Sequence, residues 1–542
     1  MSKRIRIVSY AINGRGMGHL TRQLAILRWV RRITTLLNVP TEIWLLTSSE
    51  ADTLARREGF CALKMPSKAM MRDANVPPAR YLAIARTWVM NAIAGLQPDL
   101  LMVDTFPGGS FGELVTALEL AKHRVLVARR VRPGFAEEDS YQALLPLYTH
   151  VITPDASQTG PIVIRDRGEL KSREAARSAL GIPEGKRAVY VSMGGGGDRN
   201  APSILPRLVR MLVDRDWHVV VGAGPLYDGE ELRGANITWL DRYTPVELLP
   251  GVDAAVSAGG YNSFHELMFV GVPTVFVPQT RIADDQEERC ARAEAAGAGR
   301  VAAKLQDVPD LLENPGSADA ARSMVPDNGA RNAAMIALSG LVPDADLRLA
   351  KDVLTPDLVA LIGRWDGEAS GTTKALELVR LLAGGTPSDL AKRRALLLDL
   401  AEQGHEVPTL PNMASGAADR VARFGKLCDQ VALPPDQALK LLNGLRRKFP
   451  AATPEDLVLS CEVLFPSFGR FDDWMGAISL LRAVPTQRTL TLHSFAQSVT
   501  DWLAQHDDLF EAVRDFSRLE GSGRRPVAEV LHLLGRPDDV HP

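Results

Sequence analysis

The sequence predicts an α/β protein with two doubly wound parallel sheets, followed by an all-helical region. Three observations support this. Short apolar runs alternate with helical patterns from residue 4 to about 300 of the 542 residues. The alternation starts twice, each time with a strand, a Gly-rich turn and a helix. From about residue 342 onward only helical spacing remains.

The first half opens with the predicted strand IRIVSY, the turn NGRGMGHLTR (13–22) and a helix over LTRQLAILRWVRRI. Further strands are expected at TEIWLLT, DLLMVD and RVLVA. The strand signal lapses over 152–186, where Pro, Gly and charged residues increase. We therefore place the first domain at 1–155 and expect a pivot between the halves at 152–165.

The second half restarts with the strand AVYVSM and the turn SMGGGGDRN (192–200). The helices PSILPRLVRMLVD and SFHELMFVG alternate with the strands HVVVGA, DAAVSA and PTVFVP. The second domain is placed at 156–341. The remainder, 342–542, has helix starts such as TPSDLAKRR, PPDQALKLL and TPEDLVLSC, and its sequence does not reveal a role.

Charge and cysteine content exclude several classes of protein. The formal net charge is −2, so no general basic field favours a nucleic-acid partner. Basic residues precede the first acidic one, Glu42, which favours an anionic partner or peripheral contact with a membrane surface as much as a solvated helix face. The four cysteines lack metal-ligand spacing, and no apolar run is long enough to span a bilayer. The expectation is a cytoplasmic protein, at most peripheral to the inner face of the membrane.

The opening turn does not fit a nucleotide-binding loop. A dinucleotide fingerprint would need a glycine where the sequence has His19 or Thr21, and no Gly-Lys-Ser/Thr follows either Gly-rich turn. The turn is therefore expected to bring backbone close to a ligand and to aim His19 into the same space, with a structural turn as the alternative. The second Gly run suits close approach to a phosphate, with a flexible linker as the alternative.

The most specific pattern lies at 253–299. A strand ends at Gly259–Gly260, and the next residues open a helix expected to carry Glu266 on its first turn. Free amides at such a helix start can hold a diphosphate, and Glu266 can accept hydrogen bonds from a ribose. The pair Asp285 and Gln286, together with Asp284, suits sugar hydroxyls, although a helix N-cap would explain the acidic run by itself.

The segment SAGGYNSFHE…GVPTVFVP…DDQ resembles the donor half of MurG-like GT-B glycosyltransferases (glycosyltransferase family 28-like), which move N-acetylglucosamine from UDP to an acceptor. GRGMGHLTR resembles the GxGHxxR turn of their acceptor half, which related nucleotide-sugar hydrolases share. PDLLMVDTFPGG looks like a cleft-facing strand and loop of that half. The resemblance covers about residues 4–340 and implies two Rossmann-like domains facing a cleft (GT-B), a UDP-sugar as donor substrate, no cofactor and no metal.

Candidate site residues follow from the turns and from this resemblance. His19 is the candidate base, because an imidazole titrates near neutral pH, and Asp104 is expected to orient it. WLDRYTP matches the nucleobase loop, so Arg242 and Tyr243 are expected to flank the base. The other expected donor contacts are Gly195, Gly196, Gly197, Arg199, Gly260, Tyr261, Asn262, Ser263, Glu266, Asp285 and Gln286, and the expected acceptor-side residues are Asn13, Arg15, Gly16, Met17 and Gly18.

The predicted function is inverting transfer of GlcNAc or a related hexose from a UDP-sugar to a hydroxyl or amine. The acceptor is a lipid-linked sugar, a polysaccharide or a small molecule, and Arg129, Arg130 and Arg132 hint that it is anionic. One alternative is a nucleotide-sugar hydrolase in which His19 activates water. Another is a non-catalytic sugar-nucleotide sensor whose helical tail binds a partner.

Overall fold

A computed structural model describes residues 4–12, 16–154, 159–195, 200–240, 244–279, 284–356, 358–360, 362, 372–383, 413–450 and 452–464. The chain divides into two compact units. The first contains residues 1–34 and 39–342, and the second contains 35–38 and 343–542.

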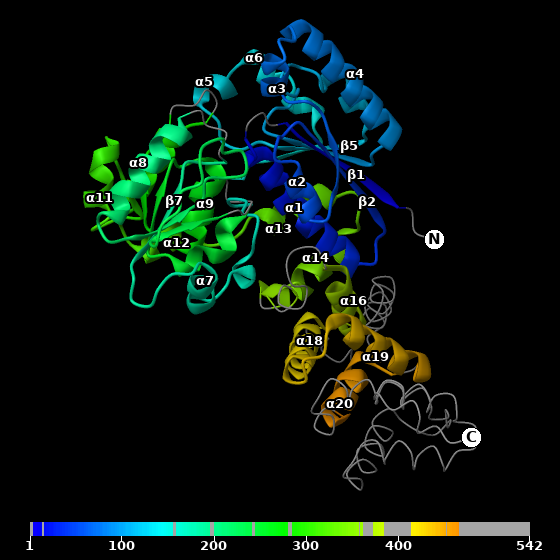
Figure 1. Cartoon of the computed structure of the whole chain (residues 1–542). Coiled ribbons are helices and arrows are strands. Elements are labelled where there is room, and N and C mark those ends of the chain that lie inside the picture. The colour runs from blue at the N-terminus through cyan, green and yellow to red at the C-terminus, as the bar shows by residue number, and fades with distance from the viewer. Residues whose placement is uncertain are drawn as a thin grey trace, which may run out of the picture. The chain divides into compact units, whose positions relative to one another are not determined.

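Two six-stranded parallel sheets organise the first unit (Figure 1). Their strand orders are β3-β2-β1-β4-β5-β6 and β12-β11-β10-β7-β8-β9, so the second repeats the doubly wound order of the first. The first sheet consists of β1 (Ile5–Ala11), β2 (Thr41–Thr47), β3 (Cys61–Lys64), β4 (Leu100–Asp104), β5 (His123–Val127) and β6 (His150–Ile152). The second consists of β7 (Ala188–Ser192), β8 (His218–Val221), β9 (Ile237–Trp239), β10 (Ala254–Ser257), β11 (Thr274–Phe276) and β12 (Gly299–Val301).

The predicted fold class, two doubly wound sheets, is confirmed. All eight strands expected from apolar runs are present. Three of them, β4, β7 and β10, are buried along their whole length, as central strands of parallel sheets are, and burial on both faces explains their unbroken apolar runs. The four strands that the sequence did not reveal, β3, β6, β9 and β12, have three or four residues each and include both edges of each sheet.

Helices cover both sheets (Figure 1). In the first half they are α1 (Gly18–Leu36), α2 (Thr53–Arg57), α3 (Lys68–Asp73), α4 (Pro78–Leu96), α5 (Pro133–Ala136) and α6 (Asp139–Gln142). In the second half they are α7 (Arg173–Ala179), α8 (Ala201–Val213), α9 (Tyr261–Val270), α10 (Gln286–Ala295), α11 (Val308–Leu311), α12 (Ala318–Met324) and α13 (Ala330–Leu338). The chain returns at α13 to the first half, because α13 packs on β6 and Arg331 lies over the ring of Trp29.

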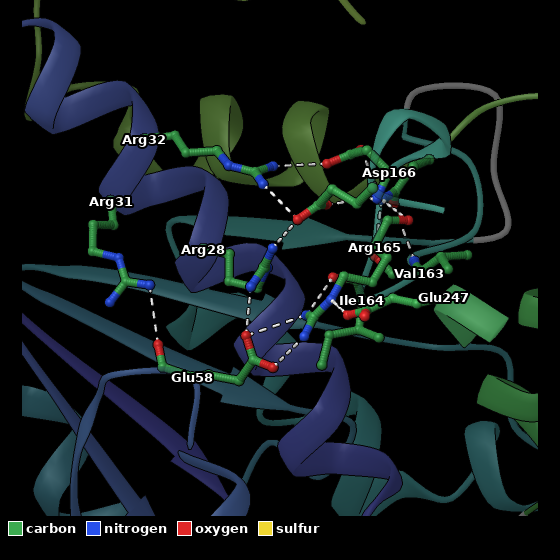
Figure 2. A network of polar contacts seen from close by, with 11 residues as sticks. Arg28, Arg31, Arg32, Glu58, Val163, Ile164, Arg165, Asp166 and Glu247 are labelled. Carbon is green, nitrogen blue, oxygen red and sulfur yellow. Dashed lines mark hydrogen bonds and ion pairs between the residues drawn. The ribbon is translucent and has the colours of Figure 1, made fainter. Parts of the chain in front are cut away.

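Buried charges join the two halves through the segment that follows β6 (Figure 2). Arg28 of α1 pairs with Glu58 and with Glu169. Arg165 donates from Nη2 to Glu58 Oε1 at 2.6 Å and from Nε to Glu247 Oε1, also at 2.6 Å. Because Glu247 lies in the 3-10 turn Pro245–Gly251 of the second half, Arg165 contacts carboxylates from both halves.

Other contacts of this segment fix its backbone. Arg32 of α1 pairs with Asp166 at 2.7 Å and with Glu169 at 2.9 Å. The Asn328 amide donates to the carbonyl of Val163 at 2.9 Å and accepts from its N–H at 3.0 Å. The part of the expected pivot nearest Arg165 is therefore held by ion pairs and hydrogen bonds rather than by loose loop backbone.

The second unit is helical where the structure describes it. Its helices are α14 (Asp344–Val353), α16 (Thr372–Ala383), α18 (Met413–Gln430), α19 (Pro435–Lys448) and α20 (Pro454–Leu464). The helix starts PPDQALKLL and TPEDLVLSC form α19 and α20, and Thr453 exchanges hydrogen bonds with Asp456 at the start of α20. TPSDLAKRR lies outside the described residues.

Candidate active site

A cavity of about 520 Å³ lies at the carboxyl ends of the strands of both sheets. The first half contributes the turn before α1, the first residues of α1, and Arg129. The second half contributes the Gly-rich turn after β7, the start of α9 and the residues before α10. Its volume is within the usual range of small-molecule sites.

His19, Asp104 and Arg22 form a buried cluster on the first side of the cavity. His19 Nδ1 contacts Asp104 Oδ2, and Arg22 grips the same carboxylate from Nε, at 2.8 Å, and from Nη2. Asp104 is the last residue of β4, and His19 and Arg22 are three residues apart on α1, a spacing that puts them on one helix face. The structure thus brings together the two residues that the sequence proposed as base and orienting carboxylate.

Electrostatics keep the His19 ring neutral. Burial lowers the pKa of His19, Asp104 raises it, and the positive charges of Arg22 and Arg129 lower it again, with a net shift below the usual 6.5. Burial would raise the pKa of Asp104, but Arg22 and His19 outweigh it and hold this pKa well below its usual range. A neutral ring whose Nδ1–H faces Asp104 carries its lone pair on Nε2, the arrangement a general base needs.

The start of α9 forms the opposite side. Tyr261, Asn262 and Ser263 line the cavity, and Gly260 caps the helix without a side-chain hydrogen bond. The positive end of the helix dipole therefore faces the cavity, a position that favours an anionic ligand. The Asn262 side-chain amide donates across the cavity to the carbonyl of Gly18 at 3.1 Å, so the starts of α1 and α9 face each other.

Glu266 lies one turn further along α9 than the sequence predicted. The helix begins at Tyr261, with no acidic residue in its first turn, so the expected place of Glu266 on that turn is wrong. Its side chain is buried and lines the cavity. Burial raises the pKa of Glu266 to about 8, although the positive charge of Arg165 opposes the shift. Near neutral pH the carboxyl group is therefore largely protonated.

Close backbone packing explains two of the glycines around the cavity. A Cβ on Gly224 would lie 2.4 Å from the backbone of Gly195, and one on Gly259 would lie 2.3 Å from the Cys290 sulfur. Both residues also have positive φ, +84° and +73°, which a side chain disfavours. Gly195 lies against Met17 of the opposite half.

Asp284 is the centre of a second charged cluster. Its Oδ1 accepts from Arg129 Nη1 at 2.9 Å and from Arg289 Nη2 at 2.7 Å, and its Oδ2 has a 3.4 Å contact with Gln286 Nε2. Arg130 and Arg132 pair with Glu288 and Glu287 at 3.3 and 3.9 Å. The three arginines that hinted at an anionic acceptor are thus matched by carboxylates of this chain.

The remaining predicted site residues fall into three groups. Gly16, Met17, Gly18, Gly195, Gly260 and Gln286 line the cavity. Asp285 does not; it caps α10, accepting from the Glu288 N–H at 3.2 Å. Outside the described residues lie Asn13, Arg15, Gly196, Gly197, Arg199, Arg242 and Tyr243.

Sequence reasoning assigned no role to Arg22 or Arg289. Arg22 is the arginine of the quoted GxGHxxR pattern, and its spacing from His19 was the available signal. Arg289 donates from Nη1 to the carbonyl of Gly259 at 2.8 Å, a contact between residues 30 positions apart that no local pattern reveals. Among the described residues no group of His, Cys, Asp and Glu could hold a metal ion, and no helix is long and apolar enough to cross a membrane.

Two doubly wound halves with a cavity between the carboxyl ends of their strands define the GT-B class of fold. The chain is also a distant homologue of MurG-like and nucleoside-diphosphate-sugar glycosyltransferases. The N-acetylmuramyl-(pentapeptide) pyrophosphoryl-undecaprenol N-acetylglucosamine transferase of Acetivibrio thermocellus is 30% identical over 150 residues, 26% of this chain and 41% of that protein. NDP-glycosyltransferase YjiC of Bacillus subtilis is 30% identical over 134 residues, 24% of this chain and 32% of that protein.

The transferase of the same name from Salinibacter ruber is 29% identical over 294 residues, which are 50% of this chain and 75% of that protein. The chain therefore spans less than half of the first two relatives and three quarters of this one. No family model matches the chain. Among solved structures, the Streptomyces glycosyltransferase SsfS6, complexed with thymidine diphosphate, has a TM-score of 0.44 at 16% identity, covering 61% of this chain and 99% of that one.

Proposed function

We propose that this chain is a metal-independent, inverting glycosyltransferase that moves a hexose, GlcNAc or a relative, from a UDP-sugar to a hydroxyl or amine. One observation carries the proposal. A neutral, carboxylate-oriented histidine and the N-terminal turn of helix α9 line the same cavity from opposite halves. The first suits proton removal from an acceptor, and the second suits a diphosphate leaving group.

In the proposed reaction, His19 Nε2 takes the acceptor proton as the acceptor oxygen or nitrogen forms its bond to the sugar C1. The bond between C1 and the diphosphate oxygen breaks on the opposite face, and its electron pair leaves with UDP. The first turn of α9 stabilises the charge of the departing diphosphate. Asp104 keeps the proton of His19 on Nδ1 and stabilises the imidazolium that forms.

Glu266 is proposed to bind the ribose of the donor. A protonated carboxyl group can donate one hydrogen bond and accept others, which matches a diol that does both. The MurG-like relatives are named for a pyrophosphoryl-undecaprenol acceptor, so a lipid-linked acceptor at the inner membrane face is one proposal for this chain.

Donor turnover by the full chain tests the proposal. UDP release from UDP-GlcNAc should require an added acceptor, such as a lipid-linked sugar, a polysaccharide or a small hydroxylated compound. Equal release in water alone would favour hydrolysis, with His19 activating water. UDP-GlcNAc binding without turnover under any of these conditions would favour a sensor.

A further inference from the structure

Arg129 lines the cavity from the first half and forms an ion pair with a side chain of the second. It follows β5, and its Nη1 donates to Asp284 Oδ1 at 2.9 Å, across 155 positions of sequence. Both side chains are largely buried, with exposed fractions of 9% and 15%. A buried charge pair of this kind fixes the geometry of its partners more than an exposed pair does.

Arg129 is one of two arginines that donate to the same oxygen of Asp284. Arg289 Nη2 approaches the same oxygen at 2.7 Å, and Arg289 Nη1 is anchored on the Gly259 carbonyl at 2.8 Å. Oδ1 of Asp284 is thus occupied by two guanidinium donors. Oδ2 receives, among the described residues, a 3.4 Å contact from Gln286, and a carboxylate oxygen can accept more than that.

Gln286 is held in the same way. Its Oε1 accepts from the Gln279 N–H at 3.0 Å, which turns its Nε2 toward Asp284 and the cavity. A carboxylate oxygen and an amide N–H side by side can accept from and donate to neighbouring hydroxyls of a neutral sugar.

We propose that Arg129 is a positioning residue for recognition of the donor sugar. Supplied by the acceptor-side half, it locks Asp284 through Oδ1, together with Arg289, so that Oδ2 and the Gln286 amide present a hydroxyl-binding pair. The inference rests on the proposed function and extends it, because the sugar-reading group is then complete only when both halves contribute.

The test compares the dissociation constants of UDP and UDP-GlcNAc for the full chain, measured by calorimetry. The ratio of the UDP dissociation constant to the UDP-GlcNAc dissociation constant reports what the sugar adds to binding. Arg129→Ala should reduce this ratio about tenfold, the effect of one lost hydrogen bond to a sugar hydroxyl, and leave UDP affinity unchanged. Arg129→Lys, which keeps the positive charge but not the planar guanidinium, should reduce the ratio less than Arg129→Ala does.

Two further variants separate positioning from general damage. Asp284→Asn should reduce the ratio by a similar factor, and the double variant with Arg129→Ala should reduce it no further, because both act through one group. Arg215→Ala is the matched control: Arg215 pairs with Asp310 at the same 2.9 Å, but on the exposed surface and away from the cavity. It should leave both constants unchanged.

An unchanged ratio in folded Arg129→Ala, or equal loss of affinity for UDP and UDP-GlcNAc, would overturn the positioning role. The second result would make Arg129 a diphosphate ligand. If the wild-type protein binds neither UDP nor UDP-GlcNAc, the proposed function fails, and this inference fails with it. If Arg129→Ala does not fold, the Asp284→Asn and Arg129→Lys ratios decide in the same way.

Discussion

Burial and three charged neighbours, Asp104, Arg22 and Arg129, set the pKa of His19. Asp104 alone would favour the imidazolium form. Burial, Arg22 and Arg129 favour the neutral form, and their combined effect lowers the pKa. Asp104 thus orients the His19 ring, while burial and the two arginines keep the ring from taking up a second proton.

This arrangement predicts the pH dependence of turnover. A base acts in its neutral form, so kcat/KM should fall only as pH drops through the lowered pKa, with an acid limb below pH 6.5. His19→Ala should abolish that limb and reduce kcat by about 10²–10⁴-fold, the usual contribution of a general base. His150→Ala, on the edge strand β6, is the control and should keep the wild-type profile. An acid limb above pH 6.5 would contradict the assignment.

Glu266 should make stability depend on pH in the opposite sense from an ion-paired acid. Its pKa is about 8 in the folded chain and 4.5 as a free group, so the folded state holds a proton that the unfolded state loses. Stability from this group therefore declines from pH 4.5 to about 8 and is constant above.

Glu266→Gln, which imitates the protonated form, should remove that decline. The Tm of this variant relative to wild type should rise steadily between pH 5 and 8, at about 2–4 °C per kcal/mol. Glu231→Gln, at an exposed position, should give a constant difference. A constant difference for Glu266→Gln as well would show that the carboxyl group is ionised when buried.

At the scale of elements, Asp285 at the start of α10 has two possible roles. Asp285 caps the helix through the Glu288 N–H, whereas the sequence pattern also suggested sugar recognition. Asp285→Ala should cost about 0.5–2 kcal/mol of unfolding free energy, and Asp285→Ser, which can still cap, much less. If Asp285→Ser binds UDP-GlcNAc as wild type does, capping is the whole role of this side chain. Weaker sugar binding by a fully stable Asp285→Ser would restore the sugar contact.

The strands and turns show how much of the fold the sequence could predict. Central strands were evident because a buried parallel strand is an unbroken apolar run, as in DLLMVD and AVYVSM. The edge strands CALK, HVI, ITW and GRV are too short to show a period. Turn chemistry located His19 and the start of α9, but the Arg129–Asp284 contact depends on how two distant loops meet, which no local pattern encodes.

At the scale of the whole first unit, the buried charges around Arg165 should control stability. Arg165→Ala would leave Glu58 buried with one partner fewer, and such a loss costs about 3–5 kcal/mol. Denaturant unfolding of the full chain measures the cost. Arg215→Ala, which breaks the exposed pair with Asp310, should cost at most about 1 kcal/mol. Equal effects of the two variants would mean that the Arg165 cluster is not an energetic centre.

The same charges have a consequence for the order in which the chain is made. Arg28 is synthesised 141 residues before Glu169, one of its two carboxylates, and Arg32 is synthesised 134 residues before Asp166 and 137 before Glu169. Arg22 and Arg28 can pair with Asp104 and Glu58 as soon as the first sheet is made, but Arg32 has both of its carboxylates in the segment after β6. A fragment ending at residue 154 would keep every strand of the first sheet but lack Asp166 and Glu169, the partners of Arg32 and one of the two partners of Arg28. The first sheet is thus contiguous in sequence, but the ion pairs of its helix α1 are completed by residues that follow it.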